Sequence, residues 1–231
     1  SVAIDGNTVV VGAYGKDGAT GAVYVLRTTD GGATYDQVAK LTASDAASGD
    51  YFGRSVAIDG STIVIGAYGD DDGGSSSGSA YVFRTTDGGA TYSQVAKLAA
   101  SDATAGDLFG HLDGVAIDGG TIVVAAHYEN NRRGAVYVFR TSDGGVTYDE
   151  VAKLTASDAA SSYDFGGSVA IAGATVVVGA HWHANGGRGA AYVLATEETG
   201  SHRGSRGGQR RPRSRRESSG DLRRGAAAAA R

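Results

Sequence analysis

The sequence lacks cysteine and methionine, and it contains one proline among its 231 residues. Without cysteine, the chain has no disulfide, no thiolate nucleophile and no thiolate metal ligand. This absence does not fix the cellular compartment, because a core of this size needs no covalent staple. No apolar run approaches the roughly 18 residues of a membrane-spanning helix. Hydrophobic residues make up 41% of the chain, which predicts a folded domain with a substantial core.

Charge is divided unevenly along the chain. Residues 201–231 hold ten Arg and two acidic residues, whereas residues 1–200 hold 11 basic and 23 acidic residues. Low apolar content and like-charge repulsion predict a disordered, Arg-rich tail at residues 200–231. The tail is either an arm for an anionic partner or a solvated extension. A charge run alone is a weak motif, so we expect no specific nucleic-acid partner.

Internal repetition dominates residues 1–194. The motif Val-Ala-Ile begins at residues 2, 56, 115 and 169, which gives periods of 54, 59 and 54 residues. Each unit contains short segments rich in Val, Ile, Tyr and Thr that are bounded by Gly, Asp and Ser, and these predict four strands, A to D. In the first unit the segments are residues 2–4, 9–13, 22–25 and 35–41.

The composition of the strands predicts how the units pack. Strand B is a continuous β-branched run in every unit, for example at residues 63–65, so both faces of each sheet are expected to be buried. Such a four-stranded antiparallel sheet is unstable alone and stacks on its neighbours, as in a β-propeller. The last unit stops after its third strand, so we expect 15 strands and a fragment of a propeller. The expected blades span about residues 1–50, 51–107, 108–163 and 164–199.

The two ends of the expected sheets differ. The A–B and C–D turns lie at one end of each sheet. We call it the constant end, because the sequence intervals that include these turns have the same length in every unit. The B–C and D–A loops lie at the other, here called the variable end. From strand B to the Tyr of strand C the interval is 11, 14, 11 and 12 residues, and from the Phe-Gly pair to strand A it is 4, 6 and 4. Turns that set register resist length changes, whereas recognition loops tolerate them, which predicts a binding face at the variable end.

Aromatic and charged side chains concentrate at this variable end. They predict a surface for a protein or carbohydrate ligand, with aromatic rings as anchors; alternatively, the rings merely cap the strand ends. The candidate ligand-binding residues are Tyr14, Tyr68, Asp70, Asp71, Asp72, His127, Tyr128, Arg132, Arg133, His181, Trp182 and His183.

No metal site is expected from these residues. The run at residues 70–72 lacks the alternating spacing of a cation-binding loop, which favours a solvated acidic loop. The pair His181 and His183 has no third ligand that recurs nearby. A further set of aspartates recurs before each Phe-Gly pair and is expected to accept hydrogen bonds from nearby backbone amides. These are Asp45, Asp50, Asp102, Asp107, Asp158 and Asp164.

The segment Phe52-Gly53-Arg54-Ser55-Val56-Ala57, followed by Gly66-Ala67-Tyr68, resembles the FG-GAP repeat. The resemblance implies the β-propeller of integrin α subunits and of bacterial and algal surface proteins. It also implies an extracellular or cell-surface adhesion module whose membrane attachment would lie in parts absent from this chain. The Pro of the family motif is replaced here by Tyr or His. The calcium loop of integrins is replaced by tight turns, so no cofactor is expected.

The expected C–D turns resemble the Asp box of sialidases and related propellers, with the pattern S/T-x-D-x-G-x-T-aromatic. In that motif the hairpin stabilises the fold and lies away from the active site. The matching residues are Asp30, Gly32, Thr34, Asp87, Gly89, Thr91, Asp143, Gly145 and Thr147.

Three functions compete. The first is a non-enzymatic binding module, the second is a sialidase-like glycoside hydrolase, and the third is a purely structural repeat array. A sialidase needs converging Arg residues and an acid/base pair. Here Arg27, Arg84 and Arg140 recur once per unit, directly before the Asp-box-like turns, which indicates a structural role. The sequence therefore predicts a binding module that is not an enzyme.

Overall fold

The computed structural model describes residues 1–182 and 189–196, and within them the protein is built from antiparallel sheets. The four sheets follow one another along the chain, with strands in sequence order, and are called blades 1 to 4. Blade 1 holds β1 (Val2–Asp5), β2 (Thr8–Ala13), β3 (Ala22–Arg27) and β4 (Asp36–Leu41). Blade 2 holds β5 (Ser55–Asp59), β6 (Thr62–Ala67), β7 (Ser79–Arg84) and β8 (Ser93–Leu98). Blade 3 holds β9 (Val115–Asp118), β10 (Thr121–Ala126), β11 (Ala135–Arg140) and β12 (Asp149–Leu154), and blade 4 holds β13 (Phe165–Ala172), β14 (Thr175–Ala180) and β15 (Ala190–Ala195).

Two helical turns interrupt the B–C loops of blades 1 and 3. They are α1 (Lys16–Ala19) and α2 (Glu129–Arg132), and both contain left-handed residues. Neither approaches the length and apolarity that a bilayer-crossing helix requires, and no other helix occurs among the described residues.

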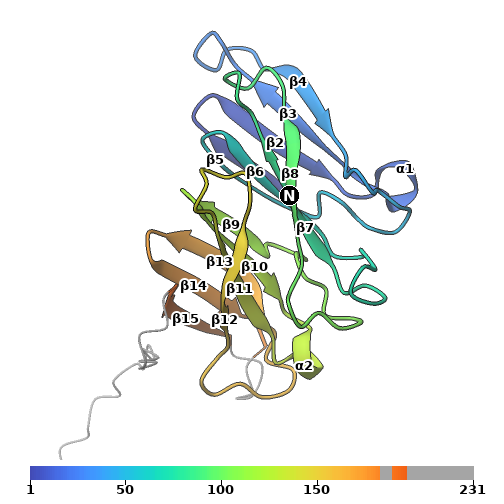
Figure 1. Cartoon of the computed structure of the whole chain (residues 1–231), viewed down its shortest axis with the longest axis vertical. Helices are drawn as coiled ribbons and strands as arrows, with labels where there is room; N and C mark the ends of the chain where they lie inside the picture. The colour runs from blue at the N-terminus through green and yellow to red at the C-terminus, as the bar shows by residue number, and fades with distance from the viewer. Residues whose placement is uncertain (183–188, 197–231) are drawn as a thin grey trace, which may run out of the picture.

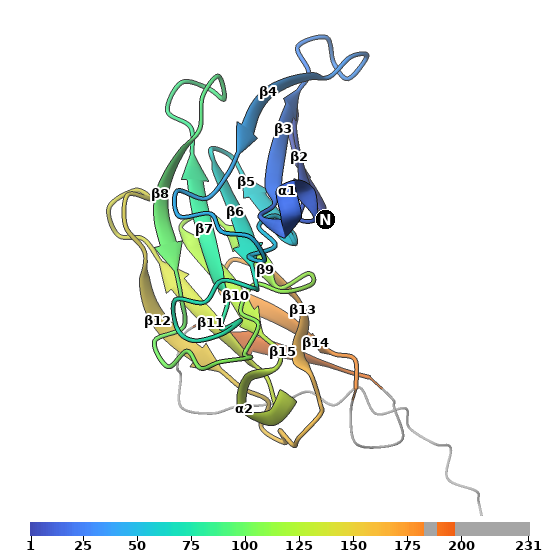
Figure 2. The ribbon, with the colours of Figure 1, turned by 90° about the vertical axis from the view of Figure 1, so that its right-hand side faces the viewer.

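The blades lie side by side in an open arc, with their first strands next to one another (Figures 1 and 2). The described residues do not close this arc, which confirms the prediction of a β-propeller fragment with 15 strands. The outer faces of the end blades stay uncovered: Val2 and Ile4 of blade 1 are 72% and 67% exposed, and Val193 of blade 4 is 51% exposed.

Each hydrophobic cluster of the core lies between two neighbouring blades. In β6, Ile63 and Ile65 pack into the cluster shared with blade 1, whereas Val64 between them packs into the cluster shared with blade 3. All three side chains are fully buried. This alternation confirms that the continuous β-branched runs are buried on both sides where a neighbour exists on each side.

A Phe-Gly pair joins each blade to the one before it. The backbone of Phe52-Gly53 lies against Gly12 and Gly21 of blade 1, and a Cβ atom at either glycine would overlap a carbonyl oxygen of the pair. The ring of Phe52 points the other way, into blade 2, where its centroid lies 5.4 Å from that of Tyr81. We call the glycine-lined surface the Phe-Gly groove.

The same groove recurs at the next two blade boundaries. Phe109-Gly110 lies against Gly66 and Gly78 of blade 2. Phe165-Gly166 lies against blade 3, where Ala125 and Gly134 hold the corresponding positions. The three Phe side chains are at most 1% exposed. The pair therefore contributes a close backbone contact to one blade and a buried ring to the next.

Hydrogen bonds between blades explain why the turn lengths at the constant end do not vary. The A–B turn of blade 1 is formed by Gly6 and Asn7, because Asp5 pairs with Thr8 as the last step of the ladder. Asp5 thus lies in the strand next to the turn, and its carboxylate accepts a 2.7 Å hydrogen bond from the amide of Gly60 in the next blade.

This inter-blade bond recurs along the array. Asp59 accepts from Gly119, and Asp118 accepts from Gly173. Arg27 likewise donates to the carbonyl of Gly88, and Arg84 to that of Gly144. A change of turn length would break these contacts, which is why the intervals at this end do not vary.

Replacing Phe109 with Ala should lower the free energy of unfolding by about 3–5 kcal/mol, because a fully buried ring leaves a cavity between two blades. Chemical denaturation followed by circular dichroism measures this effect. Val146→Ala is the control, since Val146 is 60% exposed and its loss should cost no more than about 0.5 kcal/mol. Equal effects of the two substitutions would contradict the role assigned to the pair.

Candidate functional site at the variable end

A row of aromatic rings crosses blades 1 to 3 at the variable end. Tyr51 stacks on Tyr68, with 4.7 Å between ring centroids, and Tyr68 meets His111 edge to face at 4.2 Å. His111 stacks on His127 at 5.0 Å. Tyr14 extends the row at one end, 6.4 Å from Tyr51. The rings come alternately from B–C and D–A loops, so consecutive blades share one aromatic surface.

At each end of the row, an arginine side chain lies over the ring of an exposed tyrosine. Tyr14 is 41% exposed, and the guanidinium of Arg54 lies 4.9 Å from the centre of its ring. Tyr128 is 38% exposed, contacts His127 edge to face, and carries Arg132 at 4.8 Å. Both contacts are within the range of cation–π attraction.

The middle of the row is partly buried: His127 is buried, and Tyr51, Tyr68 and His111 are half-buried. His127 is 2% exposed, its Nε2 lies 3.4 Å from Nδ1 of His111, and its own Nδ1 has no hydrogen-bond partner among the described residues. Burial lowers the pKa of each imidazole to about 4, and the electrostatic effect of neighbouring groups adds to this for His111. Both rings are therefore neutral at pH 7 and act as aromatic spacers in the row.

Other predicted site residues are distributed around this row. Arg132 forms two bonds, of 2.7 and 2.6 Å, with the fully buried Asp164, which also lies 3.2 Å from His181. Trp182 is 55% exposed, and Arg133 lies on the surface. His183 and the predicted tail at residues 200–231 lie outside the described residues.

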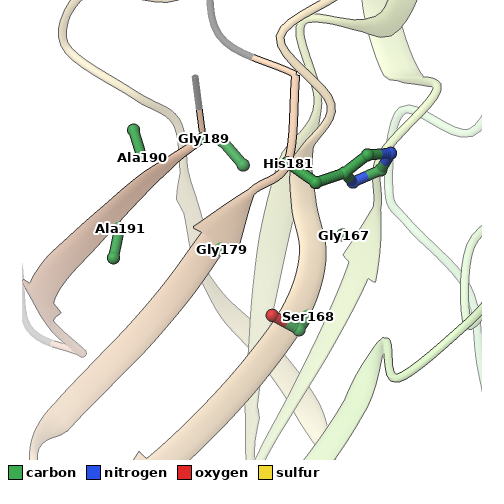
Figure 3. Close-up of a pocket in the computed structure, with 8 residues that line it drawn as sticks. Gly167, Ser168, Gly179, His181, Gly189, Ala190 and Ala191 are labelled. Carbon is green, nitrogen blue, oxygen red and sulfur yellow. The ribbon is translucent and has the colours of Figure 1, made fainter. Parts of the chain in front are cut away.

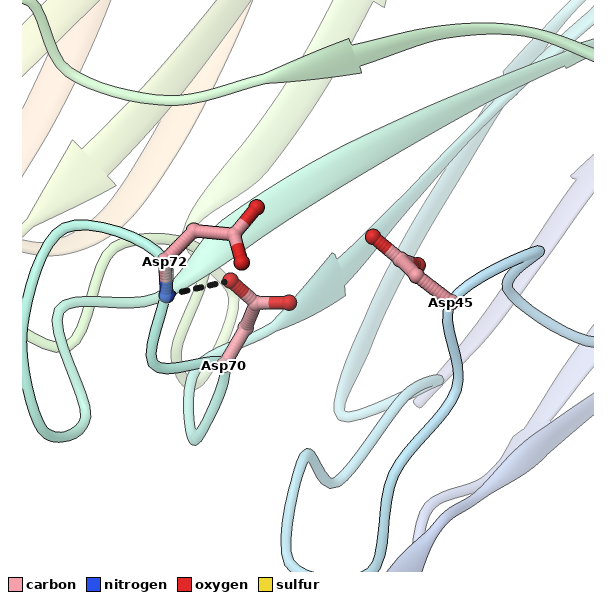
Figure 4. Close-up of side chains that lie close together, drawn as sticks. All are labelled: Asp45, Asp70 and Asp72. Carbon is pink, nitrogen blue, oxygen red and sulfur yellow. Dashed lines mark hydrogen bonds between the residues drawn. The ribbon is translucent and has the colours of Figure 1, made fainter.

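The structure corrects the expectation of a solvated acidic loop at residues 70–72. Asp70 is 4% exposed and lies close to Asp45 and Asp72 (Figure 4). The three carboxylates surround the ammonium of Lys97. The Lys97 Nζ lies 2.7 Å from Asp45, 2.9 Å from Asp70 and 2.5 Å from Asp72. Asp71 and Asp72 are exposed, as expected. Asp70 therefore pairs with a lysine of its own blade and offers no open surface to a ligand.

Charge pairing decides the protonation of this cluster. Burial disfavours the charged form of Lys97, but its bonds to three carboxylates outweigh burial and raise its pKa. Burial likewise opposes ionisation of Asp45 and Asp70, yet the hydrogen bonds they accept from Lys97 and from hydroxyl groups hold the pKa of both carboxyls below the usual range. The three carboxylates lie close enough together to hold a metal ion, and the ammonium of Lys97 supplies the positive charge at that place.

Five of the six recurring aspartates divide into two kinds, and the sixth, Asp164, accepts hydrogen bonds from Arg132 in place of the predicted amide. Asp50 and Asp107 accept local amide hydrogen bonds, from Ala47 and Thr104, as the sequence predicted. Three others bond across a blade boundary instead, which corrects the prediction for them. Each accepts a hydrogen bond of 2.7–2.9 Å from a tyrosine hydroxyl of the following blade, in the pairs Asp45 with Tyr81, Asp102 with Tyr137 and Asp158 with Tyr192.

A lysine accompanies this bond in blades 2 and 3. Lys153 lies 2.6 Å from Asp102 and 3.0 Å from Glu129, as Lys97 lies beside Asp45 and Asp70. We call this recurring set the Tyr-Asp-Lys clasp. It joins strands C and D of one blade to the D–A loop of the preceding blade, so part of the variable end is fixed by the same kind of contact in each blade.

The C–D turns at the opposite end are held internally. Asp30 accepts a bond from the Thr34 amide at 3.0 Å and from the Thr34 hydroxyl at 2.7 Å, and the hydroxyl of Thr28 accepts from the amide of Gly32. These bonds hold the pKa of the Asp30 carboxyl well below its usual range. Blades 2 and 3 repeat the arrangement around Asp87 and Asp143.

Tyr51, Arg54 and His111 were not among the residues singled out from the sequence. Tyr51 directly precedes its Phe-Gly pair, whereas His111 directly follows one, so no constant spacing connects them. Their nearness to the Phe-Gly pairs was the available signal, because the pairs lie at a blade boundary.

Comparison with known proteins identifies the repeat. A profile described as the FG-GAP repeat matches residues 1–26, 35–83, 92–139 and 148–194. The chain belongs to the FG-GAP repeat family. A search of curated proteins found no match. Among solved structures, the chain is similar to the crystal structure of Saccharomyces cerevisiae Sqt1, with 11% identity and a TM-score of 0.44. That similarity covers 77% of this chain and 40% of the other.

Family membership gives a coarse function. FG-GAP repeat proteins are generally repeat-based binding modules without enzymatic activity, and such repeats typically occur in extracellular or cell-surface proteins.

Replacing Lys97 with Met should lower the free energy of unfolding at pH 7 by roughly 3 kcal/mol, because the buried Asp70 carboxylate loses its counter-charge. The deficit should shrink as the pH falls below about 4, where carboxylates gain protons. Denaturation at several pH values measures both effects. Lys40→Met is the matched control, since Lys40 and its partner Asp17 are 40% and 58% exposed and their pair should contribute less than about 1 kcal/mol. A pH-independent deficit would contradict this role of Lys97.

His111 and His127 should make the protein less stable in mild acid. Their pKa in the folded chain is about 4, below the ordinary value of 6.5, so between these pH values the unfolded chain binds protons that the folded chain does not. The free energy of unfolding should therefore fall as the pH drops from 6.5 to 4. His127→Phe keeps a ring in the row but cannot titrate, so it should flatten this slope. An unchanged slope in that variant would refute the assignment.

Proposed function

We propose that this chain is a non-enzymatic module that recognises a protein or carbohydrate ligand through its variable end. The proposal rests on one observation: the aromatic row of Tyr14, Tyr51, Tyr68, His111, His127 and Tyr128 spans three blades as one surface. Its exposed ends combine aromatic rings with guanidinium groups, which suits flat sugar faces, planar peptide groups and acidic side chains.

The chemistry of the surface supports recognition over mere capping of strand ends. Capping would bury the rings against the strands beneath them, whereas Tyr14, Tyr128 and Trp182 retain 41%, 38% and 55% of their exposure. Exposed aromatic residues supply binding energy at low entropic cost because they have few rotatable bonds. The loops that carry them differ in length and sequence between blades, as a recognition surface requires.

The typical location of the family supports a secreted or cell-surface protein, with adhesion as the role that suits such a surface. The partner would be a protein or a glycan, with no role for nucleic acid. Membrane attachment would depend on segments outside this chain, and no metal or other cofactor takes part.

A sialidase-like hydrolase is the weaker alternative. Such an enzyme needs arginines that converge on one substrate carboxylate. Arg27 and Arg84 lie at the constant end in different blades, and each donates a hydrogen bond to a backbone carbonyl of the following blade. Arg140 bonds to Thr196 at 2.6 Å. These contacts support the structural role expected for the three arginines.

Screening the chain on glycan and cell-surface-protein arrays tests the proposal. For any ligand found, Tyr128→Ala and Trp182→Ala should each weaken binding by about tenfold or more, because exposed aromatics act as hot spots. Tyr35→Ala is the matched control, since Tyr35 is 41% exposed but lies at the constant end, and it should leave binding unchanged.

Two outcomes would contradict the proposal. If Tyr35→Ala weakens binding while the other variants do not, the binding face lies at the constant end. If a fluorogenic sialoside is hydrolysed by the purified chain, the hydrolase alternative replaces the binding module.

A further inference from the structure

Blade 4 carries a pocket of about 380 Å³ that is lined mainly by Gly, Ala and Ser residues of β13, β14 and β15. Figure 3 shows that Ser168, Gly179 and Ala191 come from three neighbouring strands and that His181 points away toward the adjacent blade. The pocket opens on the side of the sheet opposite the cluster shared with blade 3. It is independent of the aromatic row and of the function proposed for it.

Two of the lining glycines correspond to the glycines of the Phe-Gly grooves in blades 1 and 2. Gly179 has the position of Gly12 and Gly66 in the repeat, and Gly189 has that of Gly21 and Gly78. In blades 1 and 2 these glycines contact the backbone of Phe52-Gly53 and Phe109-Gly110. The described residues place no Phe-Gly pair against Gly179 and Gly189.

Blades 2 and 4 also share a hydrogen-bond donor beside this groove. In blade 2, the hydroxyl of Ser55 donates a buried 2.6 Å bond to the carbonyl oxygen of Gly110, the glycine of the pair seated there. Ser168 has the same position in blade 4 and lines the pocket. The pocket thus offers the glycine surface and the hydroxyl donor that a Phe-Gly backbone uses elsewhere in this molecule.

The apolar surface around the pocket is uncovered only in this blade. Val177 and Val193 are 41% and 51% exposed. The valines at the same repeat positions in blades 1 to 3 are all 0% exposed, namely Val10, Val64 and Val123 for the first and Val25, Val82 and Val138 for the second. In blades 1 to 3 the following blade covers these valines. The exposed face of blade 4 therefore resembles the faces that a following blade covers elsewhere in the molecule.

We propose that the pocket on blade 4 is an acceptor groove for the Phe-Gly pair of a further FG-GAP blade. The occupant is the segment Phe-Gly-x-Ser that precedes the first strand of such a blade. Its backbone lies over Gly179 and Gly189, and its glycine carbonyl accepts a bond from Ser168. The following sheet then covers Val177 and Val193.

A synthetic peptide with the sequence of residues 50–57, Asp-Tyr-Phe-Gly-Arg-Ser-Val-Ala, tests the proposal. Labelled with a fluorophore, it should bind the full chain saturably in a polarisation assay. The peptide with Phe52→Ala loses the buried ring, and the peptide with Gly53→Ala places a methyl group against the groove, where Gly53 lies close to the Ala22 carbonyl. Each change should weaken binding by about tenfold or more, which corresponds to about 1.4 kcal/mol.

The decisive variant is Gly189→Ala. In the filled grooves, a Cβ at the corresponding glycine would overlap the Phe carbonyl oxygen, whereas at Gly189 the nearest atom is the Ala180 oxygen at 3.3 Å. Gly189 also lacks the positive φ that Gly21 and Gly78 adopt, so alanine there needs only a shift of a few tenths of an ångström from the Ala180 oxygen while no Phe-Gly pair is bound. The variant should keep the wild-type melting curve and bind the peptide at least about tenfold more weakly. Gly15→Ala is the control, because its Cβ meets nothing within 4 Å.

Three results would overturn the proposal. The first is the absence of saturable binding of the unaltered peptide. The second is binding that neither the peptide changes nor Gly189→Ala affects, which would mean that the peptide binds elsewhere. The third is self-association of the chain, in sedimentation experiments, that Gly189→Ala abolishes and the peptide cannot compete with; the occupant would then be a second copy through another segment.

Discussion

The contact between a Phe-Gly pair and the glycine-lined groove of the preceding blade is the interaction on which the array depends. Gly12 and Gly21 have no side chains, so the backbone of Phe52-Gly53 can approach the backbone of blade 1 directly. The ring of Phe52 then fills the core on the side of blade 2. One dipeptide therefore connects two apolar sheets, neither of which is stable with both faces in water.

The remaining inter-blade contacts are polar and repeat with the blades. At the constant end, Asp5 and Arg27 reach the turns of the next blade, so any change in turn length would break bonds in two blades at once. At the variable end, the Tyr-Asp-Lys clasp fixes the D–A loop close to the sheet while leaving the rest of the loop free to differ. This division explains how a highly regular array keeps one surface open to variation, and why we assign ligand recognition to that surface.

The aromatic row illustrates how the variable end becomes a surface rather than a set of separate loops. Tyr51 and His111 come from D–A loops, and Tyr68 and His127 from B–C loops. They stack alternately because adjacent blades bring the two kinds of loop together at each boundary. Neutral imidazoles suit the interior of the row, since a buried charge without a partner would be costly there. The exposed tyrosines at its ends leave aromatic faces available to a ligand.

Repetition made much of this structure readable from the sequence alone. The strands, their number, the blade architecture and the two unequal ends follow from hydrophobic periodicity and interval lengths, which are properties of neighbouring residues in one unit. Contacts between blades join residues some 30 to 60 positions apart, and no local pattern encodes them. Only the tertiary structure therefore redirected Asp45 to Tyr81 and added Tyr51 and His111 to the site. Within blade 2, only the folded sheet showed that Asp70 is the buried partner of Lys97, since the two residues lie in a loop and in a strand that are far apart in the sequence. It also showed that no Phe-Gly pair of the described residues lies against Gly179 and Gly189. The sequence could not show this, since such glycines look alike whether or not a neighbouring blade covers them.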